Sequence, residues 1–515
     1  MSRIVTRVIL ANDAVAAPEQ VKTVRRNMDV EPRTRAVTRR RLIEKHEAED
    51  QPLSPQRPSL QSANRTITQV TQLIKGDFHM VFSLKRRPRT VLAAVASVAL
   101  VACIAGCSTS PSDTSSGAGG KKTNLTLEIW DPAQTQGVQK AIDGFEVANT
   151  NISVDLEQVP NNVYNTRLQA SLGAGQGPDV MWQSSTASQY ANGGALESLD
   201  SYIKKDNLSL SAYPKKLVDL YNFNGHQYGI PKDQDVYTLI YNTAVFKKLG
   251  VTDLPTTNWT WDDMVRIAKE LRAKQTSPSD FPLYYQYTFN STVASLIHQL
   301  GGTVIKDKKG NVATPEATKA LEMVKALQDD KLIPAVADST DYNAISSLIS
   351  GNLAMAWTPS WNLSLLDKSQ SGLADGTLKA VPLPSVNGSR AEDTNGISYV
   401  MNANSAHKAD SWKLIKYLTS SQGATLQAEG GAAMPANVSA SVQAAYYATH
   451  DSIGDLKTAM KPMLSSSYLR TTTQYPAVLA NNPQIEAALG DYYAGSISTA
   501  DVETKIDELY TASFQ

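Results

Sequence analysis

The sequence predicts an α/β protein with a body of two lobes, each lobe a sheet flanked by helices. Apolar residues alternate over 125–129 and again over 152–156, a pattern typical of strands, and a segment with helical apolar spacing separates them. This β-α-β order favours a parallel sheet. The body, residues 125–515, is longer than one compact core usually supports, so we expect two lobes.

Helical segments follow one another along the body. Val138, Ile142 and Phe145 share one face of the first helix, and Thr260 and Asp263 form a capping box that opens a later one. The other predicted helices have the same apolar spacing and are 162–172, 315–329, 341–351 and 408–420. Helices dominate from about residue 436 to the end.

Aromatic side chains stand at the predicted strand ends. Trp130-Asp131 follows the first strand, and Trp182-Gln183 follows a short strand around 178–181. In such sheets ligands bind beyond the carboxyl ends of the strands. We therefore expect Trp130, Trp182 and Gln183 to face a ligand.

The body is acidic and has no thiol. Residues 108–515 contain 31 basic and 40 acidic side chains, which disfavours a nucleic-acid partner because such a partner requires a basic surface. Both cysteines, Cys103 and Cys107, precede the body, so it has no disulfide or cysteine nucleophile. The six histidines lack companions at ligand spacing, so we expect no metal, and no cofactor motif is present.

Residues 80–107 have the pattern of a secretion signal. Basic residues within 85–89 precede an apolar stretch over 91–106, which is shorter than the roughly 20 residues of a membrane-spanning helix. The end of this stretch resembles the bacterial lipobox, in which the cysteine is acylated and becomes the mature N-terminus. Cys107 is thus the expected lipid attachment, at the outer face of the cytoplasmic membrane.

Two further segments flank this signal. Residues 1–79 are rich in Arg, Gln and Pro without a sustained apolar period, so they are either a disordered extension or the product of a mis-assigned start codon. Residues 108–124 are rich in Ser, Gly and Thr, which is typical of a flexible tether.

Short motifs occur in a fixed order along the body. They include Gly177-Pro178-Asp179-Val180, Tyr228-Gly229-Ile230-Pro231, Leu239-Ile240-Tyr241-Asn242, Thr260-Trp261-Asp262-Asp263, Gly351-Asn352-Leu353-Ala354-Met355 and the run 412–418. Together they resemble the signature of bacterial extracellular solute-binding protein family 1, the maltose-binding-protein-like receptors of ATP-binding cassette importers.

The resemblance implies a periplasmic-binding-protein-like two-lobe fold of type II, in which the chain crosses a hinge several times. Lobe one would comprise 125–240 and 385–435, and lobe two 241–384 and 436–515. The resemblance also implies a monomeric, lipid-anchored receptor without enzymatic activity that delivers its ligand to membrane permease subunits.

A sugar presents apolar ring faces and a rim of hydroxyls, so its site requires flat aromatic rings with carboxylates and amides around them. The resemblance places Trp361 where the family has a stacking tryptophan, and Asp235 where many members have a carboxylate. Asp233 and Tyr237 share the face of Asp235 if this stretch is extended, and the alternative for Asp233 is a solvated loop charge. Trp357 either faces the ligand or fills the core beneath Trp361.

Asn395 and Gly396 begin the strand that returns to lobe one. An amide and a bare backbone suit close approach to a ligand, so we count both residues among the candidates. Trp259, Trp261 and Trp412 lie at helix starts or within helices and are expected to pack in the cores.

These observations favour an extracytoplasmic carbohydrate-binding receptor for a neutral (oligo)saccharide. One alternative is a receptor for a non-sugar solute, a polyamine or a phosphorylated glycerol, and a phosphate would require a cation such as Lys232. The other is a glycoside hydrolase, which would need a second carboxylate opposite Asp233 and Asp235. The sequence locates no such carboxylate.

Overall fold

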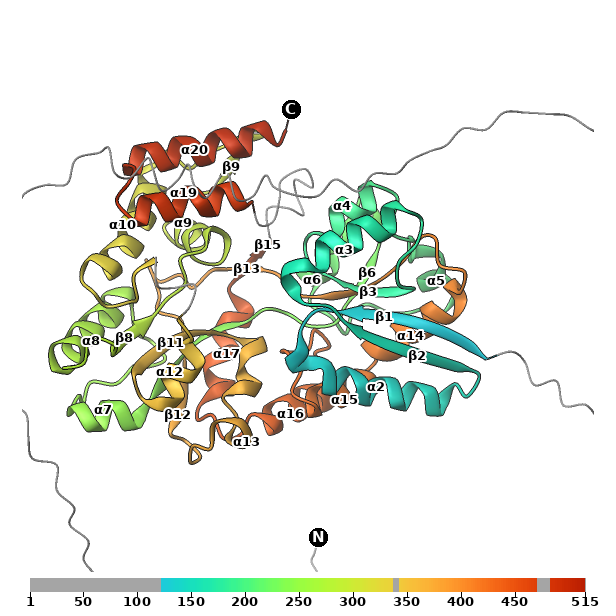
Figure 1. Cartoon of the computed structure of the whole chain (residues 1–515), viewed down its shortest axis with the longest axis horizontal. Helices are drawn as coiled ribbons and strands as arrows, with labels where there is room; N and C mark the ends of the chain where they lie inside the picture. Colours follow the sequence, from blue (N-terminus) through green and yellow to red (C-terminus); the bar gives the residue numbers. More distant parts are fainter. Residues whose placement is uncertain (1–121, 337–341, 470–481, 515) are drawn as a thin grey trace, which may run out of the picture. The chain divides into compact units, whose positions relative to one another are not determined.

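The computed structural model describes residues 122–336, 342–469 and 482–514 of the 515-residue chain. The predicted extension, the signal with Cys107, and most of the tether lie outside these described residues. Two hydrophobic cores organise the described part, and Figure 1 shows the helices and strands around them. We call the elements around the core of β1 lobe one, and those around the core of β7 lobe two.

A five-stranded sheet of order β2-β1-β3-β14-β6 lies at the centre of lobe one. Its strands are β1 (Thr123–Ile129), β2 (Ile152–Gln158), β3 (Val180–Gln183), β6 (Gly229–Pro231) and β14 (Ser398–Met401). Strands β2, β1 and β3 are parallel, as the β-α-β pattern predicts. Strand β14 is antiparallel to β3 and to β6. The sheet is therefore mixed, because a strand from a distant part of the chain enters it in the opposite direction.

Helices cover both faces of this sheet, with α3 and α4 on one side and α2 on the other (Figure 1). The elements of lobe one outside its sheet are η1 (Pro132–Gln134), α2 (Thr135–Ala148), α3 (Asn161–Gly173), α4 (Ala187–Asn192), α5 (Asp200–Lys205), α6 (Lys215–Leu220), β4 (Asn222–Phe223), β5 (His226–Gln227), α14 (Lys408–Thr419) and α15 (Ser421–Glu429). Val138, Ile142 and Phe145 are buried on α2, which confirms the predicted apolar face.

A four-stranded sheet of order β12-β7-β11-β8 lies at the centre of lobe two. Its strands are β7 (Tyr237–Asn242), β8 (Phe281–Tyr284), β11 (Leu353–Pro359) and β12 (Leu378–Pro382). Strand β7 is buried along its whole length and pairs with β11 and β12. The chain therefore enters this sheet at Tyr237, a few residues before the boundary expected at 240.

Helices make up most of the rest of lobe two. The elements outside its sheet are α7 (Thr243–Leu249), α8 (Trp261–Lys274), η2 (Phe289–Ala294), α9 (Ser295–Gln299), β9 (Ile305–Lys306), β10 (Lys309–Gly310), α10 (Pro315–Asp329), α12 (Ala344–Ser350), η3 (Ser360–Leu365), α13 (Lys368–Ser371), β13 (Glu392–Thr394), α16 (Ala440–Thr449), α17 (Leu456–Ser465), β15 (Ser467–Leu469), α19 (Pro483–Tyr493) and α20 (Thr499–Ala512). The capping box of Thr260 and Asp263 opens α8 as predicted. Trp259, Trp261 and Trp412 are buried, as expected of packing residues.

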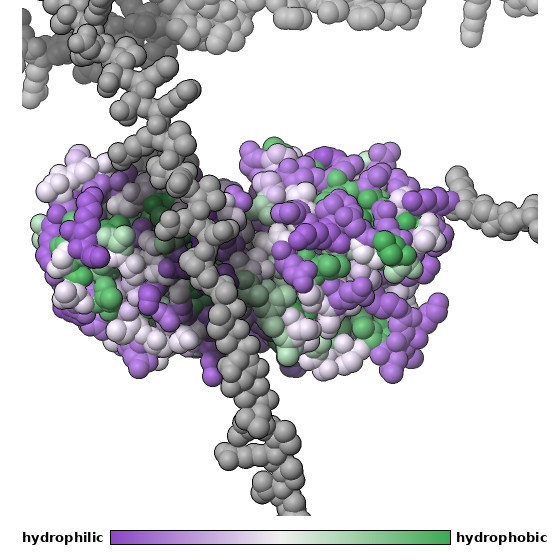
Figure 2. All heavy atoms as spheres, turned by 90° about the horizontal axis from the view of Figure 1, so that it is seen from below, coloured by the Kyte–Doolittle hydropathy of each residue, from purple (hydrophilic) through white to green (hydrophobic). Residues whose placement is uncertain are grey.

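Hydrophilic residues predominate on the face drawn in Figure 2, and apolar residues are scattered among them. Within the described ranges, no helix combines the length and the apolar character that crossing a bilayer requires.

The two cores are connected by three crossing segments, 231–236, 394–398 and 433–436. These segments are tied together by backbone hydrogen bonds. The Asp235 N–H donates to the Asn395 carbonyl over 2.9 Å, and the Gln234 N–H donates to the Met434 carbonyl over 2.9 Å. Residue 234 and its neighbours therefore lie between the other two crossing segments.

Gly396 lies where two crossing segments approach closely. A Cβ atom at this position would lie 2.3 Å from the carbonyl oxygen of Asp233, well inside van der Waals contact. The hydroxyl of Tyr221 donates to the Gly396 carbonyl over 2.6 Å. The space beside Gly396, which we expected a ligand to enter, is therefore occupied by another segment of the chain.

We expect Gly396→Ala to lower the free energy of unfolding by roughly 1–3 kcal/mol, because the new methyl group must displace the Asp233 backbone. The matched control is Gly490→Ala on α19, where a Cβ meets nothing within 4 Å and alanine favours the helix. Urea unfolding of both variants measures the difference. Equal stabilities would contradict the close approach at Gly396.

Candidate functional site

A pocket of about 270 Å³ lies beyond the carboxyl end of β1, against the crossing segments. We call it the cleft pocket. Its lining residues come from lobe one, lobe two and all three crossing segments, and they are Trp130, Asp131, Gln134, Asn161, Asn165, Ser184, Thr186, Asp233, Asp235, Trp361, Asn395, Ile397 and Ala433. Five of the ten sequence candidates are thus brought together at the predicted kind of place, a strand end.

The lining of the cleft pocket combines aromatic, amide and acidic groups. The indoles of Trp130 and Trp361 are half-buried, so part of each ring is accessible. Among the described residues that line the pocket, none is Lys or Arg. The pocket therefore offers hydrogen-bond acceptors and apolar ring faces without a positive charge.

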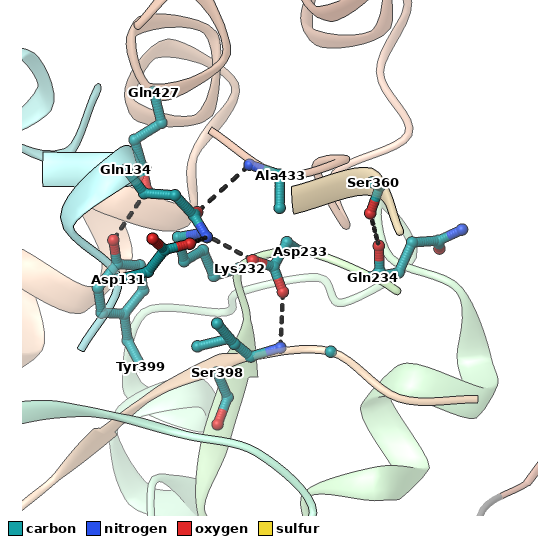
Figure 3. Close-up of polar contacts among 12 residues, drawn as sticks. Asp131, Gln134, Lys232, Asp233, Gln234, Ser360, Ser398, Tyr399, Gln427 and Ala433 are labelled. Carbon is teal, nitrogen blue, oxygen red and sulfur yellow. Dashed lines mark hydrogen bonds and ion pairs between the residues drawn. The ribbon is translucent and has the colours of Figure 1, made fainter. Parts of the chain in front are cut away.

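A buried ion pair forms part of the pocket wall, and Figure 3 shows its polar contacts. The ammonium of Lys232 lies 2.7 Å from Oδ2 of Asp233, and their side chains are 3% and 1% exposed. Lys232 also donates to Oε1 of Gln134 over 2.6 Å, and its Nζ lies 4.5 Å from the centre of the Trp182 ring. The Lys232 ammonium, which we considered as the partner of a phosphate ligand, is therefore already paired within the protein.

The ion pair extends into a network that orients the pocket lining (Figure 3). Gln134 donates through Nε2 to Oδ2 of Asp131 over 2.9 Å. Oδ1 of Asp131 accepts from the N–H of Ala133 over 3.0 Å and caps the short helix η1. On the other side, the Ile397 N–H donates to Oδ1 of Asp233 over 2.6 Å. One network therefore holds both the carboxylate of Asp131 and a crossing segment.

Asp235 and Asn395 face the pocket as a bonded pair from two crossing segments. The Nδ2 of Asn395 donates to Oδ2 of Asp235 over 2.6 Å. Both side chains are only partly buried. Oδ1 of Asn395 is itself buried, so the polar atoms that a ligand can reach are the Asn395 Nδ2 and the Asp235 carboxylate.

Each accessible tryptophan rests on buried aromatic rings. Trp130 makes edge contacts with Trp182 at 5.3 Å and with Tyr164 at 5.0 Å between ring centres. Burial raises the pKa of Tyr164 well above its usual value, so its hydroxyl stays protonated and donates to the Trp182 carbonyl over 3.0 Å. In lobe two, Trp361 contacts the edge of Tyr237 at 5.8 Å. These supports fix the planes of the two accessible indoles.

Four candidates do not line the cleft pocket. Trp182 and Gln183 belong to β3 itself and are buried. The Trp182 ring contacts Trp130 and the Lys232 ammonium, and Gln183 accepts from the Thr186 hydroxyl over 3.1 Å. Tyr237 and Trp357 stack at 4.6 Å between ring centres and are 2% and 3% exposed. The strand-end argument placed the end of β3 two residues too early, so it assigned a buried indole to the pocket.

Asp233 and Gly396, two further candidates, also have structural partners here. Asp233 reaches the pocket lining while both of its carboxylate oxygens are bonded to Lys232 and to the Ile397 backbone. Gly396 is buried against Asp233 and does not line the cleft pocket. Neither residue is the solvated loop charge or the open backbone that we considered.

Sequence reasoning missed the amides of Asn161 and Asn165, which line the pocket from α3. The signal was available, because Asn161 follows the end of β2, the strand next to β1. The same strand-end rule that selected Trp130 applies there.

Trp357 lines a separate pocket of about 340 Å³ in lobe two, together with Tyr284 and Tyr342. Within the part of the chain that the structure describes, no group of three or more His, Cys, Asp or Glu side chains is placed to hold a metal ion.

Comparison with known proteins identifies the family. A model of the bacterial extracellular solute-binding protein family matches residues 131–425, more than half of the chain. The maltotriose-binding protein of Pyrococcus abyssi is 24% identical over 301 residues, which are 56% of this chain and 62% of that protein. The chain thus spans less than two thirds of this relative's length.

Solved structures show the same fold. An ABC substrate-binding protein of Listeria monocytogenes in complex with cycloalternan aligns with a TM-score of 0.68 at 22% identity, over 76% of this chain and 98% of that chain. UgpB of Mycobacterium tuberculosis in complex with glycerophosphocholine aligns with a TM-score of 0.65 at 16% identity, over 76% and 98%. The predicted two-lobe, periplasmic-binding-protein-like fold of type II is confirmed.

We expect Lys232→Met to lower the free energy of unfolding by about 3–5 kcal/mol, because it leaves the carboxylate of Asp233 buried without its cation. The control is Lys215→Met, which breaks an exposed ion pair with Asp219 and should cost about 0.5 kcal/mol or less. Urea unfolding measures both. A similar small loss in the two variants would contradict the buried ion pair.

Proposed function

We propose that this chain, which belongs to the bacterial extracellular solute-binding protein family, is a receptor for a neutral (oligo)saccharide. It would bind its ligand outside the cytoplasm and deliver it to the permease subunits of an ATP-binding cassette importer. The observation that carries the proposal is the chemistry of the cleft pocket, which has two accessible indoles, carboxylates and amides, and no cation among the described lining residues.

This chemistry matches a sugar ring. Trp130 and Trp361 offer flat apolar surfaces for the C–H faces of a pyranose, while Asp131, Asp235 and Asn395 offer acceptors and a donor for its hydroxyls. Trp182 and Tyr237 would act indirectly, since they contact Trp130 and Trp361, and Trp357 in turn stacks on Tyr237.

The mechanism would be closure of the two lobes around the ligand, without a chemical reaction. Trp361 approaches the pocket from lobe two and Trp130 from lobe one, so a ligand that touches both binds the closed state better than the open one. Binding then shifts the population toward the closed state, which the permease would recognise. No bond is made or broken.

The name of the Pyrococcus abyssi relative, a maltotriose-binding protein, supports a carbohydrate ligand. We further propose that the receptor is a monomer and that it is anchored through a lipid on Cys107. The lipobox-like end of the signal supports the anchor.

A phosphorylated or otherwise anionic solute fits the pocket less well. Such a ligand needs Lys or Arg side chains, and Lys232 is buried with Gln134 and Asp233 as partners. A hydrolase is also disfavoured, because it needs a proton donor beside a second carboxylate. Asp233 is held in its ion pair with Lys232, and Asp131 and Asp235 both act as hydrogen-bond acceptors toward amides, which suits binding of hydroxyls and does not suit a proton donor.

We expect Trp361→Ala to weaken sugar binding on the order of 30- to 1000-fold, because an aromatic face that desolvates against C–H groups is lost. Asp235→Ala should also weaken binding. Calorimetric titration against a panel of neutral glycans measures affinity, and thermal unfolding without ligand measures stability.

The comparison for Trp361→Ala is Trp259→Ala in the core of lobe two, which is expected to cost about 3–5 kcal/mol of stability. If Trp361→Ala kept full affinity, or lost as much stability as Trp259→Ala, the indole would belong to the core and the proposed site would be wrong.

The mature protein is expected to begin at an acylated Cys107, because the apolar stretch ends there. Intact mass of the membrane-extracted protein measures this. Cys103→Ala should leave the mass of the mature protein unchanged, because residue 103 is removed with the signal. Cys107→Ala should abolish processing and anchoring. A mature form that still contains residues 1–79 would disprove the assignment.

A further inference from the structure

A second hollow adjoins the cleft pocket on lobe one. It has a volume of about 560 Å³ and lies between α3 and α4, and we call it the α3–α4 groove. Asn165 and Thr186 line both the groove and the cleft pocket, so the two hollows share a wall. The cleft pocket alone, about 270 Å³, is slightly smaller than the ~300–1,000 Å³ typical of small-molecule sites.

The α3–α4 groove is polar without being charged. Every described residue that lines it is uncharged, and its side-chain amides come from Asn165, Gln169, Gln189 and Asn404. An amide donates and accepts hydrogen bonds, as a sugar hydroxyl does. A groove of this kind has nothing to neutralise an ionic ligand.

The amides on α3 form a row that begins in the cleft pocket. Asn161, Asn165 and Gln169 follow one another at intervals of four residues, and Gly173 continues the row at the far end of the groove. Four residues advance a helix by about 6 Å, so the amides stand on one face at a spacing comparable to one sugar unit in an extended glycan.

The single charged residue of α3 points elsewhere. Arg167 pairs with Glu157, and its NH2 atom lies 3.4 Å from Glu128. An exposed helix face of a soluble protein usually carries charges. The uncharged row on α3 is therefore a feature of the face that lines the groove.

The α4 side of the groove contributes an aromatic ring. Tyr190 of α4 is half-buried, and its hydroxyl donates to the Asn165 carbonyl over 3.3 Å. Burial raises the pKa of Tyr190, so this hydroxyl stays neutral. A phenol ring held beside a row of amides offers an apolar face next to polar groups, which is how proteins contact sugars.

We propose that the α3–α4 groove is an extension of the ligand site that binds further sugar units, so that the ligand is an oligosaccharide that runs from the cleft pocket along α3. The inference rests on the proposed function and adds the length of the ligand and the direction in which it lies. Trp130 and Trp361 would hold the unit in the cleft, and the amide row the units beyond it.

The experiment is a length series. Calorimetric titration with α-1,4-gluco-, β-1,4-xylo-, α-1,5-arabino- and β-1,4-galacto-oligosaccharides of one to six units measures how affinity grows with chain length. For a series that binds, we expect roughly tenfold or more between two and four units, as one or two well-made contacts are worth that much.

Gly173→Trp is the blocking variant. A Cβ at Gly173 meets nothing within 4 Å, so the chain can accept the indole, which then fills the far end of the α3–α4 groove. We expect it to remove the gain with length while affinity for the shortest bound sugar changes less than about twofold. The matched control is Gly490→Trp on α19, another glycine with open space at its Cβ, which should change neither.

Gln169→Ala gives a second measurement that does not depend on filling space. It should weaken the longer oligosaccharides about 5- to 10-fold and leave the shortest one unchanged. Gln169 is exposed, so this substitution should not disturb folding.

The outcomes separate the two proposals. If short sugars bind and Trp361→Ala abolishes that binding, but affinity does not rise with length or Gly173→Trp leaves the rise intact, the extension is wrong and the receptor stands. If no sugar of any length binds, both the proposed function and the extension are wrong. A length gain that both Gly173→Trp and Gln169→Ala remove supports the extension.

Discussion

Lys232 and Asp233 form an ion pair almost out of reach of water, at the point where the chain leaves lobe one. Burying two charges is costly unless each finds further hydrogen bonds, and here each does. Lys232 bonds to Gln134, which orients Asp131 in the cleft pocket, and Asp233 bonds to the backbone of Ile397 in another crossing segment. The geometry of the pocket and the path of the chain between the lobes therefore depend on the same few atoms.

Features that depend on nearby residues could be predicted from the sequence. The β-α-β start, the capping box of Thr260 and the buried tryptophans at 259, 261 and 412 rest on local spacing, and the structure has them. The mixed character of the first sheet could not be predicted, because β14 reaches β3 from more than two hundred residues away. Trp182 was misjudged for a similar reason, because the side chains around its indole, Trp130, Lys232 and Tyr399, come from three other parts of the chain.

The candidate site shows the same division. Trp130, Asp235, Trp361 and Asn395 line one pocket, and these were selected from a strand end and from family motifs. Lys232 pairs with its neighbour Asp233, but its second partner, Gln134, lies 98 residues earlier in the chain, and no local pattern indicates that hydrogen bond or the burial of the pair. A lysine that looked available for a phosphate is thus a buried structural group. Similarly, the row of amides on α3 has meaning only once the groove beside it is known.

The position of β14 also determines when lobe one can form during synthesis. This strand fills the place between β3 and β6, yet it follows β3 by more than two hundred residues. A chain that emerges with its N-terminus first exposes β1, β2 and β3 long before the strand that closes their sheet exists. Contacts of such sequence separation slow folding. Lobe one should therefore remain incomplete until most of the protein has been made, and a chain exported as proposed would still be partly unfolded for most of its synthesis.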